Sequence, residues 1–154
     1  MTILVTGGAG FIASHIVDSY ITLGYKVIVV DNLSRGKKEF INKKAQFFEV
    51  DITNKKEITH IIKEKSPDII NHHAAQISVQ NSVHDPNNDA QINIIGLLNI
   101  LEAAKGISVK KIIFASSGGA IYGEAKEVPT TENYVPLQPL SPYGISKLAS
   151  EYYL

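Results

Sequence analysis

Short apolar runs alternate along the chain with segments whose apolar positions recur every three to four residues. The runs are rich in Val and Ile, which favour strands, and the periodic segments are typical of helices with one buried face. This alternation predicts an α/β fold with a parallel sheet, helices on both faces and right-handed crossovers. The predicted strands are residues 3–5, 26–30, 46–50, 68–71 and 111–115.

Four helices are predicted between and after these strands. The first carries apolar residues at helical spacing over 11–23 and would end at Gly24. The second begins at Asn54, a good capping residue. A long helix is predicted for residues 88–104, and a last one begins at Pro142. Residues 118–141 contain glycines and prolines, which predict an irregular connection.

A glycine-rich turn, VTGGAGFI, lies where the first predicted strand meets the first helix. Gly7 permits a sharp turn, and Gly10 lets backbone N–H groups approach phosphate oxygens at the positive end of that helix. The second strand ends at Asp31, close to the spacing at which a carboxylate binds the ribose of a dinucleotide. These features predict a Rossmann-type, doubly wound sheet with ligands beyond the carboxyl ends of the strands.

Tyr143 and Lys147 lie four residues apart on the last predicted helix and therefore share one face. A free tyrosine has a pKa of about 10 and is a poor base at neutral pH. The Lys147 ammonium and the positive charge of an oxidised nicotinamide would both favour the phenolate. A serine hydroxyl in FASSGGAIYG could bind a substrate alkoxide; counting from Phe114 selects Ser117, with Ser116 as the alternative.

The chain at this point resembles the extended short-chain dehydrogenase/reductases, in the branch of UDP-glucose 4-epimerase-like nucleotide-sugar epimerases. The matching segments keep the family's order and spacing: VTGGAGFI, DNLSRGK, VDI, HHAAQ, NIIGLLN, FASSGGAIYG and SPYGISK. The resemblance implies NAD as cofactor, a UDP-sugar as substrate, and epimerisation through transient oxidation at the sugar C4 and return of the hydride. Asp31 favours NAD, because a carboxylate repels the extra phosphate of NADP.

The resemblance also assigns roles to single residues. Tyr143 would be the base, Lys147 its electrostatic partner and a ribose ligand, and Ser117 the hydroxyl helper, while Asn93 would brace the active-site backbone. The cofactor-binding residues it implies are Gly7, Gly10, Phe11 and Ile12 at the pyrophosphate, Asp31, Asn32 and Ser34 at the adenosine ribose, Asp51 and Ile52 at the adenine, and His73, Ala74, Ala75 and Gln76 towards the nicotinamide.

The resemblance has limits that bear on the domain organisation. Ala13 stands at the place of the family's third glycine, and the final helix shows no stop signal. Family members are longer, and their later part supplies further strands and most of the sugar-nucleotide pocket. We therefore expect residues 1–154 to form an NAD-binding Rossmann domain that is incomplete at its C-terminus, without the substrate-binding part. The resemblance also implies a homodimer that packs through the helix of Tyr143.

Composition excludes several other classes of function. The 15 basic and 15 acidic residues cancel, which argues against nucleic-acid binding. The chain has no cysteine, so thiolate catalysis is excluded. Adjacent His72 and His73 would point to opposite faces of a strand, and we expect no metal site. No apolar run is long enough to span a bilayer, and a cytoplasmic location is expected.

Two alternatives remain open. Related 4,6-dehydratases and sugar-nucleotide decarboxylases usually carry an acidic residue just after the serine or threonine of the fifth strand. Gly118 and Gly119 occupy those places here, which favours epimerase chemistry. The other alternative is an NAD-binding fragment that is inactive or needs a partner chain; retention of NAD without conversion of UDP-galactose would favour it.

Overall fold

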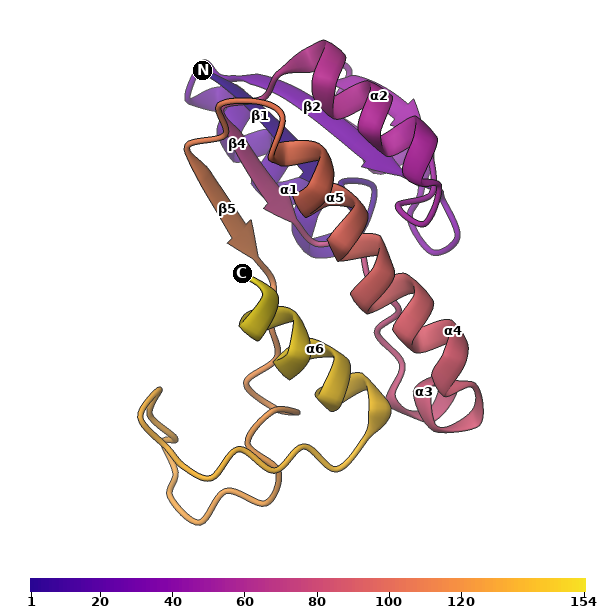
Figure 1. Cartoon of the computed structure of the whole chain (residues 1–154). Coiled ribbons are helices and arrows are strands. Elements are labelled where there is room, and N and C mark those ends of the chain that lie inside the picture. The colour runs from indigo at the N-terminus through magenta and orange to yellow at the C-terminus, as the bar shows by residue number, and fades with distance from the viewer. The chain divides into compact units, whose positions relative to one another are not determined.

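The computed structural model describes residues 1–154 and contains five parallel strands in the order β3-β2-β1-β4-β5 (Figure 1). The order reverses at β1, as in a Rossmann-type sheet, so the predicted fold class is confirmed. The elements are β1 (Thr2–Thr6), α1 (Phe11–Thr22), β2 (Lys26–Asp31), η1 (Lys38–Phe40), β3 (Gln46–Glu49), α2 (Lys55–Lys65), β4 (Ile69–His72), α3 (Val79–His84), α4 (Pro86–Ala90), η2 (Gln91–Ile95), α5 (Gly96–Ala104), β5 (Lys111–Phe114) and α6 (Pro142–Tyr153).

The chain divides into two compact units. The first consists of residues 1–75 and 96–115 and contains the whole sheet with α1, α2 and α5. The second consists of residues 76–95 and 116–154 and contains α3, α4, η2, α6 and the irregular connection before α6. None of the helices is both long enough and apolar enough to cross a bilayer.

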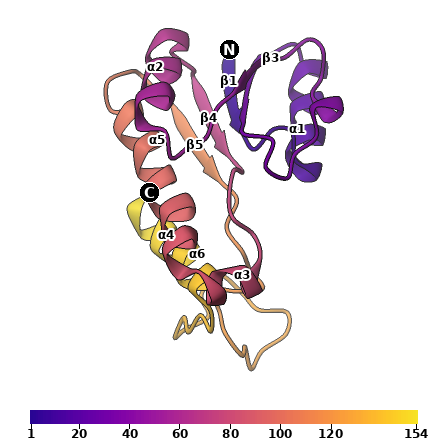
Figure 2. The same cartoon turned by 90° about the vertical axis from the view of Figure 1, so that its right-hand side faces the viewer.

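The first unit is a three-layer arrangement. Figure 2 shows α1 on one face of the sheet and α2 with α5 on the other. The strands β1 and β2 are covered on both faces, which explains their continuous apolar sequence. On the α1 side the core is formed by Ile3, Val5, Val27 and Val29 of the strands with Ala13 and Val17 of the helix.

The helix predicted for residues 11–23 is present as α1, but its buried face is not the one with the large apolar residues. Phe11 and Ile12 are 74% and 66% exposed, whereas Ala13, Ser14 and Val17 are buried. Small side chains on the inner face let the helix approach the strands closely. The large apolar residues that begin this helix therefore lie outside the core, whereas Tyr20 and Ile21 pack against it partly buried.

The long helix predicted for residues 88–104 is present as a continuous helical segment that begins two residues earlier and ends at Ala104, but it is not regular. The chain forms α4 from Pro86, then the π-helix η2, then α5. Asp85 caps α4 by accepting a hydrogen bond from the Asn88 amide at 3.0 Å. The short helix α3 was not predicted; Ser78 caps it by accepting from the Asn81 amide at 3.2 Å. A five-residue π-helix leaves no distinct apolar period in a sequence.

The hydroxyl of Thr6 joins the carboxyl ends of β1 and β4. Thr6 is fully buried, and its Oγ1 lies 2.6 Å from His72 Nδ1. The same oxygen accepts a hydrogen bond from the Ala74 amide at 3.2 Å, and the Thr6 carbonyl accepts one from the His73 amide at 3.1 Å. These bonds hold the first residues after β4 against the end of β1.

Replacing the Thr6 hydroxyl with a methyl group, Thr6→Val, is expected to lower the free energy of unfolding by about 1–3 kcal/mol, because it removes bonds between buried groups. The matched control is Thr22→Val, since the Thr22 hydroxyl bonds to the Asp18 carbonyl at 2.8 Å on the exposed surface of α1. That control should change stability by no more than about 0.5 kcal/mol. Urea unfolding measures both, and equal losses would contradict the role given to Thr6.

Candidate functional site

The turn after β1 is built around a close approach of two backbone segments. Gly7 has φ +69°, and its amide donates to the Val30 carbonyl at 2.8 Å. A Cβ at this position would lie 2.7 Å from the Ala74 nitrogen. Only glycine fits this turn without displacing backbone. The ends of β1, β2 and β4 therefore meet at Gly7, where the order of the sheet reverses.

The N-terminus of α1 follows this turn and is free of side-chain caps. Its N-cap residue is Gly10, which offers no side-chain acceptor, and no acidic residue lies in the first turn. By contrast, a side-chain oxygen caps α2, α3, α4 and α6, from Asn54, Ser78, Asp85 and Ser141 respectively. The first amides of α1 and its positive dipole end thus suit an anion such as a pyrophosphate.

Asp31 ends β2 and lies against the same turn. It is only 8% exposed; its Oδ2 accepts from the Ala9 amide at 3.0 Å and its Oδ1 from the Leu33 amide at 2.8 Å. A carboxylate has further lone pairs and can accept from ribose hydroxyls as well. Asn32 and Ser34 follow in the next loop, where Asn32 Oδ1 accepts from the Ser34 amide at 3.0 Å.

Asp51 organises the loop after β3. Its carboxylate accepts from the Asn32 side chain at 2.7 Å and from the amide and hydroxyl of Thr53 at 2.8 and 2.7 Å. Burial opposes ionisation of Asp51, but the hydrogen bonds from Thr53 and Asn32 outweigh it and hold its pKa below the ordinary value. The next residue, Ile52, is buried, and its carbonyl accepts from the Asn99 side chain at 3.0 Å.

The remaining predicted residues of the first unit are His73, Ala74 and Ala75, which follow β4 at the carboxyl edge. The structure thus gathers one set of predicted cofactor ligands around the ends of neighbouring strands in a single unit. The other predicted residues belong to the second unit: Gln76, Asn93, Ser117, Tyr143 and Lys147.

In the second unit, the side chain of Asn93 pairs with the backbone of Gln76. Asn93 Oδ1 accepts from the Gln76 amide at 2.8 Å, and its Nδ2 donates to the Gln76 carbonyl at 3.0 Å. Asn93 is 3% exposed and sits in the π-helix η2. Its side chain therefore fixes the backbone at the start of this unit.

Tyr143 and Lys147 lie one turn apart on α6, as predicted. The Lys147 Nζ is 5.9 Å from the centroid of the Tyr143 ring. Lys147 is 4% exposed, and this burial lowers the pKa of its ammonium from 10.5 to about 8, although the charge of Asp89 opposes the change. Gly144 lets α6 pack on the connection, since a Cβ there would lie 2.7 Å from the Ala120 carbonyl oxygen.

The two serines that follow β5 have different surroundings. The Ser117 carbonyl accepts from the amides of Ala120 and Ile121, which forms a tight turn. The Ser116 hydroxyl instead donates to the carboxylate of Glu151 on α6. A carboxylate thus holds the hydroxyl of Ser116, whereas that of Ser117 has no such side-chain acceptor. Of the two hydroxyls that the sequence offers, the one on Ser116 is therefore the one held by a carboxylate.

Sequence reasoning missed four polar residues that build these sites: Thr6, Asp89, Asn99 and Glu151. Three of them, Thr6, Asp89 and Asn99, are buried within strands or helices. A polar residue on the inner face of a predicted helix was the available signal for Asp89 and Asn99. For Glu151 the sequence carries no such signal, because its partner Ser116 is 35 positions away.

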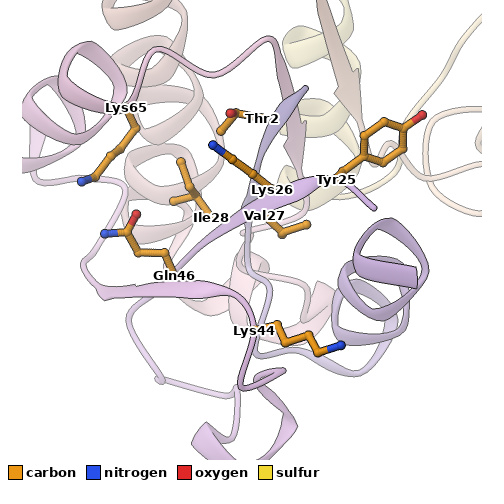
Figure 3. Close-up of a pocket in the computed structure, with 8 residues that line it drawn as sticks. All are labelled: Thr2, Tyr25, Lys26, Val27, Ile28, Lys44, Gln46 and Lys65. Carbon is orange, nitrogen blue, oxygen red and sulfur yellow. The ribbon is translucent and has the colours of Figure 1, made fainter. Parts of the chain in front are cut away.

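A depression of about 430 Å³ lies at the opposite edge of the sheet, where the strands begin (Figure 3). Its walls include three lysines, and none of the predicted site residues lines it. The lining residues are Thr2, Tyr25, Lys26, Val27, Ile28, Lys44, Gln46 and Lys65. No group of three or more His, Asp or Glu side chains that could hold a metal ion is present.

Comparison with known proteins relates this geometry to one family. The family model described as "NAD dependent epimerase/dehydratase family" matches residues 3–154. UDP-glucose 4-epimerase of Thermotoga maritima, solved with UDP-glucose, is 52% identical over 99% of this chain and 50% of its own, with a TM-score of 0.96. The Thermus thermophilus enzyme, solved with NAD, is 48% identical over 99% of this chain and 49% of its own, with a TM-score of 0.95.

A further relative has the same name and is also matched over about half of its length. UDP-glucose 4-epimerase of Mycolicibacterium smegmatis is 42% identical, and the match covers 100% of this chain and 50% of the relative. The chain therefore spans about half the length of the proteins that it matches.

The close approach at Gly7 can be tested with Gly7→Ala. We expect a larger loss of stability than for Gly24→Ala, because Gly24 also has a positive φ, +83°, but a methyl group added there would meet no atom within 4 Å. The Gly24 variant isolates the cost of the backbone conformation, about 1–2 kcal/mol. Urea unfolding of both variants is the measurement, and equal losses would contradict the tight packing of the turn against Ala74.

Proposed function

The chain belongs to the NAD dependent epimerase/dehydratase family, and from that membership we propose that it binds NAD through its first unit and carries the proton-transfer residues of a UDP-glucose 4-epimerase in its second. The observation that carries the proposal is the uncapped N-terminus of α1 at the Gly7 turn, beside the Asp31 carboxylate. Together these groups offer anion-binding amides and a carboxylate for ribose hydroxyls, which is what a dinucleotide requires.

The residues of the first unit fit the cofactor chemically. The amides after Gly10 would hold the pyrophosphate, and the exposed Phe11 and Ile12 leave the helix start open to it. Asp31 would accept from the adenosine ribose and would disfavour the extra phosphate of NADP. Asp51, kept ionised by its hydrogen bonds, would hold the loop at the adenine.

The residues of the second unit fit the proposed proton transfer. NAD, when bound, supplies a hydride acceptor and donor for the sugar C4. Tyr143 would take the proton of the sugar 4-hydroxyl and later return it, and the Lys147 ammonium would stabilise the phenolate by its opposite charge. Ser117 would hold the sugar oxygen by a hydrogen bond. Asn93, through its two bonds to Gln76, would keep the backbone of this unit in place.

Epimerase chemistry is favoured over dehydratase or decarboxylase chemistry. The positions after Ser117 are Gly118 and Gly119, which carry no acid or base, and a methyl group added at either would meet no atom within 4 Å. Two of the similar solved structures are UDP-glucose 4-epimerases.

We also propose a UDP-sugar as the substrate, a cytoplasmic location and homodimerisation through α6, on which Ile145, Tyr152 and Tyr153 are exposed.

NAD binding by the 154-residue chain is the direct test. Isothermal titration should detect NAD binding, and Asp31→Asn should weaken it about 10- to 100-fold, because a charge-assisted hydrogen bond is lost. The control is Asp18→Asn, which removes an exposed carboxylate of α1 and should leave NAD binding unchanged. The same variant of Asp31 should also reduce the preference for NAD over NADP.

Turnover is assayed in parallel with UDP-galactose and NAD. Conversion to UDP-glucose would show that these 154 residues suffice for epimerisation. NAD binding without conversion would limit the chain to the NAD-binding portion of such an enzyme. Absence of NAD binding, with the chain folded, would contradict the proposal.

A further inference from the structure

Asp89, in α4, is a fully buried carboxylate to which the proposed chemistry gives no role. Burying a carboxylate is costly unless hydrogen bonds and an opposite charge compensate for the lost water. The surroundings of Asp89 in the second unit provide both. The hydrogen bonds of Asp89 and its effect on Lys147 indicate the role of this buried charge.

Three donors surround the Asp89 carboxylate. Its Oδ1 accepts from Gln76 Nε2 at 2.9 Å and from Asn93 Nδ2 at 3.0 Å, and its Oδ2 accepts from the Ser146 hydroxyl at 2.6 Å. Two of these donors belong to the pair that fixes the start of the unit. The third lies on α6, immediately before Lys147.

The face of α6 that meets Asp89 is built from small hydroxyl residues. Ser146 and Ser150 are one turn apart and buried, and they contact Asp89 and Asn93, which are also four residues apart. The Ser150 hydroxyl lies 3.3 Å from the Asn93 carbonyl oxygen, within the π-helix η2. These contacts fix both the rotation and the height of α6 against α4 and η2 (Figure 2).

The negative charge of Asp89 acts on the buried Lys147. Burial favours the neutral amine of Lys147, and Asp89 acts in the opposite direction by attracting the ammonium. The other ionisable groups near this helix are differently placed. Tyr143 lies beside Lys147, Glu151 is bonded to Ser116, and His84 and Asp85 are exposed at the ends of α3 and α4.

We propose that Asp89 is a positioning residue for Lys147: its buried carboxylate is the counter-charge that keeps the Lys147 side chain an ammonium, and its bond with Ser146 fixes the turn of α6 that bears the lysine. Without the charge of Asp89, a larger share of Lys147 beside Tyr143 would be the neutral amine at neutral pH. The catalytic meaning of this role rests on the proposed function, but the charge of Lys147 can be measured without NAD or turnover.

The test follows the side-chain carbon signals of Lys147 in the lysine-labelled 154-residue chain by NMR, with Lys147→Arg to assign them. Asp89→Asn keeps the shape of the side chain and removes its charge, and it should lower the midpoint of the Lys147 titration by about one pH unit or more. From a starting pKa of about 8, that change would reduce the ammonium at pH 7.5 from about three quarters to about one quarter.

Two control variants separate charge from structure. Asp85→Asn removes an equal charge four residues away at an exposed position and should leave the Lys147 titration unchanged. Ser146→Ala removes the hydrogen bond but keeps both charges, and it should move the titration by less than Asp89→Asn does. Equal titrations in Asp89→Asn and in the unsubstituted chain would overturn the proposal, whatever the outcome for NAD binding.

A second measurement applies even if Asp89→Asn does not fold. In the unsubstituted chain, the carboxyl carbon signal of Asp89 should move as Lys147 loses its proton, over the same range of pH. An Asp89 signal that does not respond to the titration of Lys147 would overturn the proposal.

Discussion

The parallel pairing of β1 with β2 on one side and with β4 on the other is the constraint on which the first unit depends. Val5 lies in register with both Val29 and Asn71, so the three strands end at nearly the same level. The chain leaving β1 must then turn within van der Waals distance of the chain leaving β4. Glycine at position 7 permits that turn, and the Thr6 hydroxyl ties the two strand ends together. The amides of α1 and the Asp31 carboxylate reach one edge of the sheet as a consequence.

The second unit depends on a different interaction, the burial of Lys147. A helix that carries an ammonium on its inner face is unfavourable unless a carboxylate lies nearby and every donor finds an acceptor. Asp89 fills this role, and the hydroxyls of Ser146 and Ser150 on α6 bond to Asp89 and to the Asn93 carbonyl, which brings the helical segments together. The same contacts hold Asn93, so the groups that fix the backbone of this unit and the groups that bear charge form one network.

The sequence predicted the features that depend on neighbouring segments of the chain and missed the contacts between residues far apart in it. The glycine turn, the strand that ends at Asp31 and the Tyr143–Lys147 pair all depend on neighbours within one or two elements, and each is found where it was expected. The sequence did not show which side of α1 contacts the strands, because the buried residues there are small ones. The role of Asp89 depends on Ser146, 57 residues away, and the break of the long helix at η2 has no periodic signature. Long-range pairs of this kind become visible only when the fold is known.

We propose that this chain holds a dinucleotide at the carboxyl edge of the sheet, at Gly7 and Asp31. An NMR titration of the isotope-labelled chain with NAD, followed at each backbone amide, tests this site directly. We expect saturable changes that are strongest at residues 7–13 and 31–34. Changes centred instead on Thr2, Lys26 and Lys65, at the depression where the strands begin, would contradict it. Absence of any saturable change would contradict it as well.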